Sequence, residues 1–208
     1  MFDAVFFDLD GTLVDTESLA VTTGLRAFAE VGHLVDERFM HGLVGKAAPQ
    51  ATEIIRGSLP GIDLEAFHAA WRLGFDTAIE TGLPLKPGAV QLLEILKYPL
   101  GLVTSTGREG AHHKLGLAGI AHHFRTVVTF DDVRHPKPAP EPYLLAAEWL
   151  GVDPARCLVF EDSDVGAEAA HRAGCVVVQV PDVAPTEGRF ARHVAEDLLA
   201  GARAAGVI

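Results

Sequence analysis

Residues 4–16 read AVFFDLDGTLVDT, in which an apolar run ends abruptly in two carboxylates, a glycine and a hydroxyl residue. A short apolar run that ends at a glycine-containing turn is typical of a buried strand in a parallel sheet. Ligands of open α/β sheets bind just beyond the carboxyl ends of the strands. Asp8 and Asp10 are therefore expected at that edge, pointing to the same side because side chains alternate along a strand.

Asp8 and Asp10 pose an electrostatic problem if both are buried at this edge. Two adjacent carboxylates repel each other, so their burial requires a cation, a shared proton, or both. Basic groups or metal ligands are therefore expected at the ends of other strands.

The composition is that of a well-packed globular protein. The chain has 208 residues, of which 49% are hydrophobic, and this is enough to bury a full core. A net charge of −11 argues against nucleic acid as a partner, because phosphate backbones are held by basic surfaces. No apolar run approaches the roughly 20 residues of a membrane helix. We expect no membrane association, a cytoplasmic location in the absence of a signal-peptide pattern, and by default a monomer.

The order of apolar and polar residues predicts an α/β fold with a helical insertion. Residues 16–84 show helical spacing and no convincing strand, whereas helices and strands alternate from residue 85 onward. Such alternation predicts a doubly wound parallel sheet with helices on both faces. The expected domains are a core of residues 1–15 and 85–208 and an all-helical insertion of residues 16–84. After the first strand, the expected strands are residues 99–104, 126–129, 156–161 and 176–180, the last being the final strand of the chain.

Polar and charged residues follow several of these strands. Thr104 ends the second strand and is followed by Ser105 and Thr106. Lys137 lies beyond the third strand, and Glu161 and Asp162 lie at the end of the fourth. All of these residues converge on one edge in a doubly wound sheet. Carboxylates are the hard oxygen donors that Mg²⁺ prefers, and lysine and hydroxyl groups neutralise phosphate oxygens. The combination indicates phosphoryl chemistry, in which one aspartate attacks phosphorus and another moves a proton.

Four short motifs resemble those of the haloacid dehalogenase superfamily. They are DLDGT at residues 8–12, LVT at 102–104, KPAPEPY at 137–143, and FEDS at 160–163 with a following glycine. The order and spacing are similar to those of the phosphoglycolate phosphatase and β-phosphoglucomutase branch. Members of this branch have a Rossmann-like core and a helical cap inserted directly after the first motif. The resemblance covers most of the chain.

The resemblance implies roles for the residues that match the motifs. Asp8 would be the nucleophile, Asp10 the general acid and base, and Thr104, Ser105 and Lys137 the phosphate-binding groups. These assignments imply a phosphomonoesterase that acts on a small phosphorylated metabolite through an aspartyl-phosphate intermediate.

The resemblance also implies a magnesium site and a recognition loop. The side chains of Asp8 and Asp162 and the backbone carbonyl of Asp10 would hold Mg²⁺. Glu161 would assist either as a direct ligand or through another group. Lys46, in the insertion, matches the loop that reaches toward the substrate in this branch and is a candidate for specificity.

Three other functions fit parts of this pattern. A β-phosphoglucomutase-like mutase is the main alternative, but such enzymes carry a histidine shortly after the first motif, and Leu19, Ala20 and Val21 occupy those positions here. Dehalogenases typically lack the second aspartate of the first motif, which Asp10 provides. A non-enzymatic phospho-accepting receiver domain also uses aspartate, a hydroxyl group and lysine, but receivers are shorter and carry no helical cap.

Overall fold

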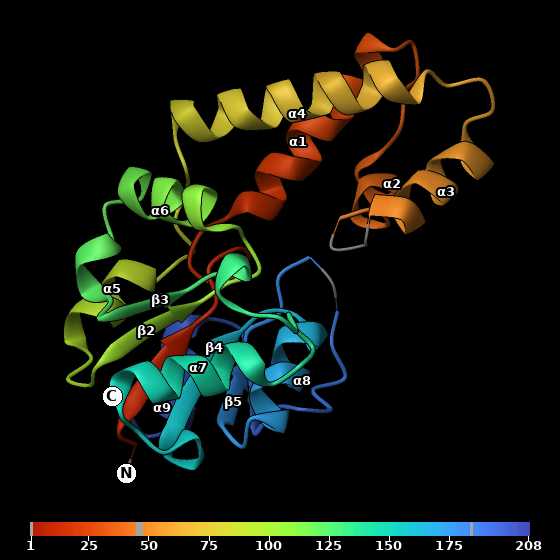
Figure 1. Ribbon diagram of the computed structural model, residues 1–208. Coiled ribbons are helices and arrows are strands. Elements are labelled where there is room, and N and C mark those ends of the chain that lie inside the picture. Colours follow the sequence, from red (N-terminus) through yellow and green to blue (C-terminus); the bar gives the residue numbers. More distant parts are fainter. Residues whose placement is uncertain (1, 45–47, 184) are drawn as a thin grey trace. The chain divides into compact units, whose positions relative to one another are not determined.

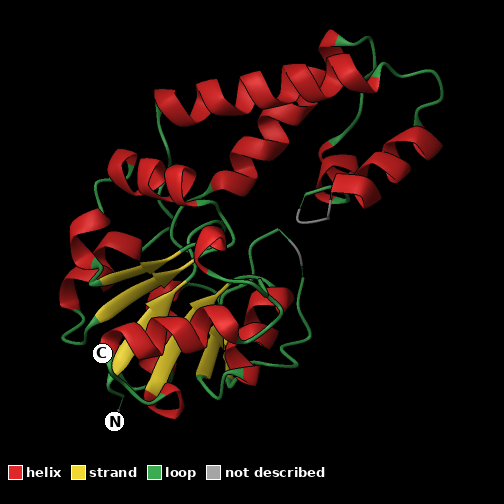
Figure 2. Ribbon diagram, viewed as in Figure 1, coloured by secondary structure: helices red, strands yellow, loops and turns green. Residues whose placement is uncertain are grey.

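The computed structural model describes residues 2–44, 48–183 and 185–208. The chain divides into two compact units, one made of Met1–Asp15 with Pro84–Ile208 and the other of Thr16–Leu83. We call them the sheet unit and the helical unit. Figures 1 and 2 show the strands gathered in the first and helices in the second.

The sheet unit contains a six-stranded sheet in which every pairing is parallel. The strand order is β3-β2-β1-β4-β5-β6, which confirms the predicted doubly wound α/β fold. The first strand lies in the middle of this order, so the acids that follow it are central. The strands are β1 (Ala4–Phe7), β2 (Leu100–Val103), β3 (Thr126–Val128), β4 (Cys157–Glu161), β5 (Val176–Gln179) and β6 (His193–Val194).

The prediction that the strand at residues 176–180 is the last one was wrong. A further strand, β6, pairs with β5 through Val178 and His193, and a helix, α9 (Leu198–Ala204), follows it. A strand of two residues is too short to show an alternating pattern, and α9 consists largely of small residues that mark no clear apolar face. These two elements therefore lack a periodic signal in the sequence.

Helices cover both faces of the sheet. Helices α7 (Glu141–Leu150) and α8 (Asp164–Arg172) pack together on one face, and α5 (Ala89–Ile95) packs with α9 on the other (Figure 1). The remaining α-helix described in this unit, α6 (Arg108–Leu117), follows β2. Such an arrangement buries both faces of a parallel sheet and leaves its carboxyl edge for ligands.

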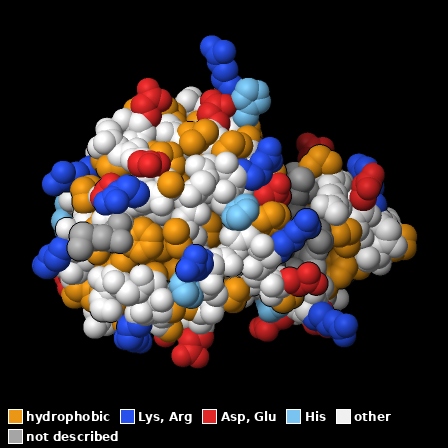
Figure 3. Space-filling model, turned by 90° about the horizontal axis from the view of Figure 1, so that it is seen from below, with side chains coloured by type: hydrophobic (Ala, Val, Ile, Leu, Met, Phe, Trp, Pro, Cys, Tyr) orange, Lys and Arg blue, Asp and Glu red, His pale blue; other side chains and the backbone are white. Residues whose placement is uncertain are grey.

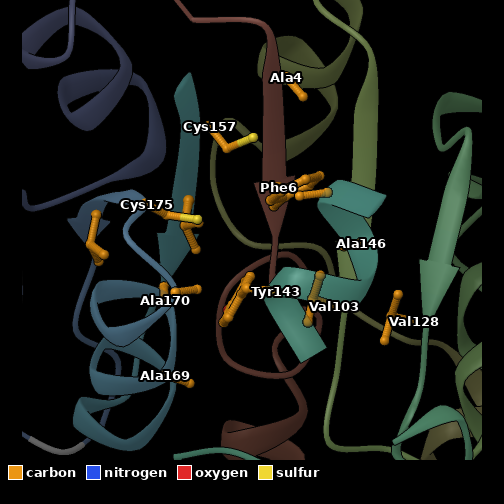
Figure 4. Close-up of a cluster of buried hydrophobic side chains, with 14 of the residues drawn as sticks. Ala4, Phe6, Val103, Val128, Tyr143, Ala146, Cys157, Ala169, Ala170 and Cys175 are labelled. Atoms are coloured by element: carbon orange, nitrogen blue, oxygen red, sulfur yellow. The ribbon is translucent and has the colours of Figure 1, made fainter. Parts of the chain in front are cut away.

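The core under α7 and α8 positions the residues that end the strands. Phe6 on β1 lies in this cluster (Figure 4). Its partner in register is Val159 on β4, and both residues are fully buried. Tyr143 on α7 is also fully buried there, with its ring 6.5 Å from that of Phe6. Cys157 and Cys175 belong to the same cluster as free, buried thiols. Because side chains alternate, the residues two positions beyond Phe6 and Val159 point to this same face.

The helical unit has a core of its own. Its helices are α1 (Thr16–Glu30), α2 (Glu37–His41), α3 (Ala48–Ser58) and α4 (Leu64–Thr81), and the described residues of the unit include no strand. Asp36 and Asp63 cap α2 and α4 by accepting hydrogen bonds from backbone N–H groups. Phe28 and Phe67 stack with their ring centres 4.0 Å apart. This stacking joins α1 and α4.

No described helix is both long enough and apolar enough to cross a lipid bilayer. On the face shown in Figure 3, acidic and basic side chains are interspersed among apolar ones. The net charge of −11 repels anions at long range, so an anionic ligand must be held by local groups.

Candidate active site

The register of the sheet brings three chain segments together at its carboxyl edge. Phe7 on β1 pairs with Leu102 on β2 and with Phe160 on β4. The next residue of each segment is Asp8, Val103 and Glu161, respectively, so these three are neighbours. Asp8 and Glu161 are both buried, and both point to the face covered by α7 and α8.

Lys137 connects these segments from the loop before α7. Its Nζ donates to Asp8 Oδ1 at 2.7 Å, to Glu161 Oε1 at 2.6 Å and to the Val103 carbonyl at 2.9 Å. The side chain is only 4% exposed, and the ammonium also lies over the Tyr143 ring, 5.1 Å from its centre. An ammonium group has three donors, and all three are used here.

Glu161 is held by more than the lysine. Its Oε1 also accepts from the Tyr143 hydroxyl at 2.9 Å, and its Oε2 accepts from the hydroxyl and the N–H of Ser163. Gly166 makes this arrangement possible, because a Cβ at that position would lie 1.7 Å from Glu161 Oε1. The glycine after the fourth motif therefore provides space for the glutamate.

Asp162 lies beside the loop that follows β1. Its Oδ1 accepts from the Thr12 hydroxyl at 3.1 Å. Gly11 has a φ of +81°, and a Cβ there would lie 2.5 Å from Asp162 Oδ2. Glycine meets both requirements at once, since it adopts positive φ freely and leaves room for the carboxylate. The DGT sequence after Asp8 is thus shaped around Asp162.

Asp10 is held by a different set of groups. Its Oδ1 accepts from Lys114 Nζ at 2.5 Å, and its Oδ2 accepts from the Thr106 hydroxyl at 2.6 Å. Lys114 lies on α6, and Thr106 lies in the turn between β2 and α6. The segment after β2 therefore orients the second aspartate of the first motif.

The other residues expected in the site are placed as follows. Thr104 is buried at the end of β2, and its hydroxyl accepts from the Thr106 N–H at 3.0 Å. Ser105 is exposed beside it. Lys46 lies outside the described residues.

The charges at the centre of the site do not cancel. Carboxylate oxygens of Asp8, Glu161 and Asp162 lie within 4.8 Å of one another, and Lys137 is the cation in contact with two of them. Burial, with help from the charge of Glu161, raises the pKa of Asp8 to about 7 in spite of Lys137. Burial acts against the charge of Lys137, but Asp8 and Glu161 outweigh it and raise its pKa above the ordinary value. Closely spaced carboxylate oxygens with excess negative charge suit a hard divalent cation.

Sequence reasoning missed Lys114 and Tyr143 as parts of this site. Tyr143 lies at the end of the quoted third motif, six residues after Lys137, and its hydroxyl reaches Glu161 because α7 packs on the sheet. Lys114 is 104 residues from Asp10, and nothing distinguishes it in the sequence from other polar residues of its helix. Only the position of α6 reveals this contact.

Comparison with known proteins points to one family. The family model for haloacid dehalogenase-like hydrolases matches residues 2–174. The fructose-1-phosphate phosphatase YqaB of Escherichia coli (strain K12) is 34% identical over 184 residues, which cover 86% of this chain and 96% of that protein.

Two solved structures are similar along nearly the whole chain. A hydrolase of the haloacid dehalogenase family from Deinococcus radiodurans R1, with bound phosphate and sodium, has a TM-score of 0.88 at 28% identity. The match covers 98% of this chain and 94% of that chain. A Thermotoga maritima protein assigned as a β-phosphoglucomutase has a TM-score of 0.83 at 29% identity. The match covers 99% of this chain and 100% of that chain.

Proposed function

The chain belongs to the haloacid dehalogenase-like hydrolase family, and we propose that it is a Mg²⁺-dependent phosphomonoesterase acting on small phosphorylated metabolites, with sugar phosphates as the leading class. The observation that carries this proposal is the placement of Lys137 between Asp8 and Glu161 at the carboxyl edge of the sheet. A buried ammonium fixed beside a carboxylate nucleophile can neutralise the phosphate that the carboxylate attacks.

In the first step, a carboxylate oxygen of Asp8 attacks phosphorus. A bond forms between Asp8 and phosphorus, and the bond from phosphorus to the ester oxygen breaks. Asp10 gives its proton to that oxygen, so the leaving group departs as a neutral alcohol. The positive charge of Lys137 beside Asp8 is suited to neutralise the phosphate, and the Thr104 hydroxyl is suited to hydrogen-bond a phosphate oxygen during this transfer.

In the second step, water attacks the phosphorus of the aspartyl-phosphate. Asp10, now ionised, accepts a proton from the water, and the bond between Asp8 and phosphorus breaks. The products are inorganic phosphate and the alcohol, and Asp8 and Asp10 return to their starting states.

The carboxylates present fit a magnesium ion. We assign the ion to Asp8 and Asp162, together with the backbone carbonyl of Asp10. A carboxylate offers about four acceptor positions, and those of Glu161 are occupied by Lys137, Tyr143 and Ser163. Glu161 is therefore assigned to holding Lys137 rather than the metal. When bound, the ion supplies positive charge that offsets the repulsion between Asp8 and the phosphate.

The alternative to hydrolysis is transfer of the phosphate within a sugar, as in a mutase. The similarity to the Thermotoga maritima protein favours testing this possibility. The residues at positions 19–21 include no histidine, and hydrolysis is the function that we favour. The relative named as a fructose-1-phosphate phosphatase supports the choice of sugar phosphates as the first substrates to test.

Phosphate release from a panel of phosphorylated metabolites tests the proposal. We expect Mg²⁺-dependent hydrolysis of p-nitrophenyl phosphate and of at least one sugar phosphate, including fructose 1-phosphate among those tested. Conversion of glucose 1-phosphate into glucose 6-phosphate without phosphate release would instead support the mutase. Purified protein with neither activity would contradict both.

The pH profile is expected to depend on the Mg²⁺ concentration. Asp8 must be ionised to attack, and its pKa is raised to about 7 by burial in the metal-free protein. A bound cation favours the charged form and lowers this pKa. The acidic limb of kcat/KM for p-nitrophenyl phosphate should therefore move to lower pH as Mg²⁺ is raised from sub-saturating to saturating levels at constant ionic strength. EDTA should abolish activity, and a limb that does not move would argue against Asp8 as a metal ligand.

Replacement of Asp10 should impair proton transfer. Asp10→Asn keeps the size of the side chain but removes the ionisable carboxyl group, and general acid–base groups contribute about 10²–10⁴-fold to rate. We expect turnover of the best sugar phosphate to fall by roughly that factor. Steady-state phosphate release measures this, and circular dichroism checks that the variant is folded. An unchanged rate would remove Asp10 from the proposed role.

A further inference from the structure

Helix α6 contributes a charged group to the site that none of the four motifs contains. Lys114 Nζ contacts Asp10 Oδ1 at 2.5 Å and lies 3.5 Å from the Thr106 hydroxyl, which itself donates to Asp10 Oδ2. Its side chain is 13% exposed, compared with 29% for Asp10, so the ion pair is largely withdrawn from water. A lysine held in this way has lost both hydration and side-chain freedom, and the contact with Asp10 compensates for that loss.

The two contacts fix the orientation of the Asp10 carboxylate. They reach different oxygens, one from α6 and one from the turn before it, so rotation about the last bond of the side chain would break both. A carboxylate offers about four acceptor positions, of which these two contacts use two. The arrangement therefore constrains the plane of the carboxylate without blocking its use.

We propose that Lys114 is a positioning residue that, together with Thr106, holds Asp10 in the orientation required for proton transfer to the leaving oxygen. The inference rests on the proposed function, because it assigns Lys114 a role only if Asp10 acts as the general acid. Lys114 acts through Asp10 and not on the phosphate, since its ammonium is already paired with the carboxylate. A misplacement of about 1 Å at a reacting group can cost roughly 10²-fold in rate.

The effect of Lys114 should depend on how much the leaving group needs a proton. Phenyl phosphate and p-nitrophenyl phosphate have nearly the same shape, but the nitro group stabilises the departing phenolate. Proton donation therefore matters more for phenyl phosphate. The quantity to compare is kcat/KM, which covers the steps up to departure of the leaving group and excludes the later attack of water.

The experiment compares Lys114→Met, Lys114→Arg and Lys97→Met with the unmodified protein at one pH and saturating Mg²⁺. Lys97 is an exposed lysine of the same unit and serves as the matched control. We expect Lys114→Met to lower kcat/KM about 10-fold or more for phenyl phosphate but less than about threefold for p-nitrophenyl phosphate. Lys114→Arg should recover most of the loss, and Lys97→Met should change neither value.

The ratio of the two substrates is measured on one preparation, so it does not depend on the fraction of protein that is folded. Equal losses on both substrates, or no loss on either, would overturn the inference while leaving the phosphatase assignment intact. If the unmodified protein hydrolyses neither ester, or if Asp8→Asn retains full activity, the proposed function fails and the inference fails with it. The two failures are thus distinguishable.

Discussion

Asp8→Asn is expected to abolish phosphate release while leaving the protein folded. The amide that replaces the carboxylate cannot form the aspartyl-phosphate, and removal of the nucleophile from an enzyme with a covalent intermediate can cost about 10⁶-fold in turnover. Phosphate release from the best substrate measures the effect. Asp3→Asn is the matched control, because Asp3 lies at the opposite end of β1, where it pairs with Arg156. Full activity in Asp8→Asn would exclude Asp8 as the nucleophile.

The same substitution should not destabilise the metal-free protein. The pKa of Asp8 is raised to about 7 by burial, whereas a carboxyl in an unfolded chain titrates near about 3.9. The folded state therefore binds the proton more tightly between these values, and the contribution of Asp8 to stability is lost as the pH rises through them. Asparagine carries no such cost. Thermal unfolding in EDTA should show Asp8→Asn at least as stable as the parent at pH 8, with the difference shrinking toward pH 4.

The central part of the fold was predictable because its strands are buried on both faces. β1 and β4 are continuous apolar runs that end in acids, and such runs can be recognised without any knowledge of their neighbours. β6 was not predictable, since it has two residues and is a strand only because β5 lies beside it. Elements defined by pairing alone leave no periodic pattern in the sequence.

In the candidate site too, residues in contiguous motifs were predictable, whereas contacts between distant segments were not. Asp8 and Glu161 were identifiable because each ends a strand, and the motifs that contain them are contiguous. Gly166 was recognised as part of a motif, but the reason for it, the space taken by the Glu161 carboxylate, appears only in the structure. The contact of Lys114 with Asp10 depends on how α6 packs. The two residues are 104 positions apart, and no sequence pattern predicts a contact over that separation.

Lys137→Met is expected to lower both stability and activity by large amounts. Methionine is similar in length but leaves Asp8 and Glu161 buried without the cation that contacts both. Removal of one partner from a buried ion pair typically costs about 3–5 kcal/mol, a large part of the roughly 5–15 kcal/mol that stabilises a protein. Activity should fall by about 10²-fold or more, because a charge that stabilises the transferring phosphate is lost. Chemical denaturation and phosphate release measure the two effects.

The loss of stability should depend on pH in a defined direction. Lysine is charged in both folded and unfolded states between pH 5 and 8, so the dependence comes from the carboxylates. Asp8, with a pKa raised to about 7, is mostly protonated at pH 5 in the metal-free protein and then needs no cation. Lys137→Met should therefore destabilise the metal-free protein less at pH 5 than at pH 8. A loss of the same size at both pH values would mean that packing, not charge, is the cause.

A second substitution tests whether the buried charge of Glu161 causes the loss of stability in Lys137→Met. Lys137→Met combined with Glu161→Gln removes the uncompensated charge but keeps an oxygen that can accept from Tyr143. We expect this double variant to regain part of the stability lost in Lys137→Met and none of the activity. Lys86→Met is the control, because the ion pair of Lys86 with Asp182 is more exposed and a smaller loss is expected there. If the double variant is no more stable than Lys137→Met, the buried charge of Glu161 is not what Lys137 compensates.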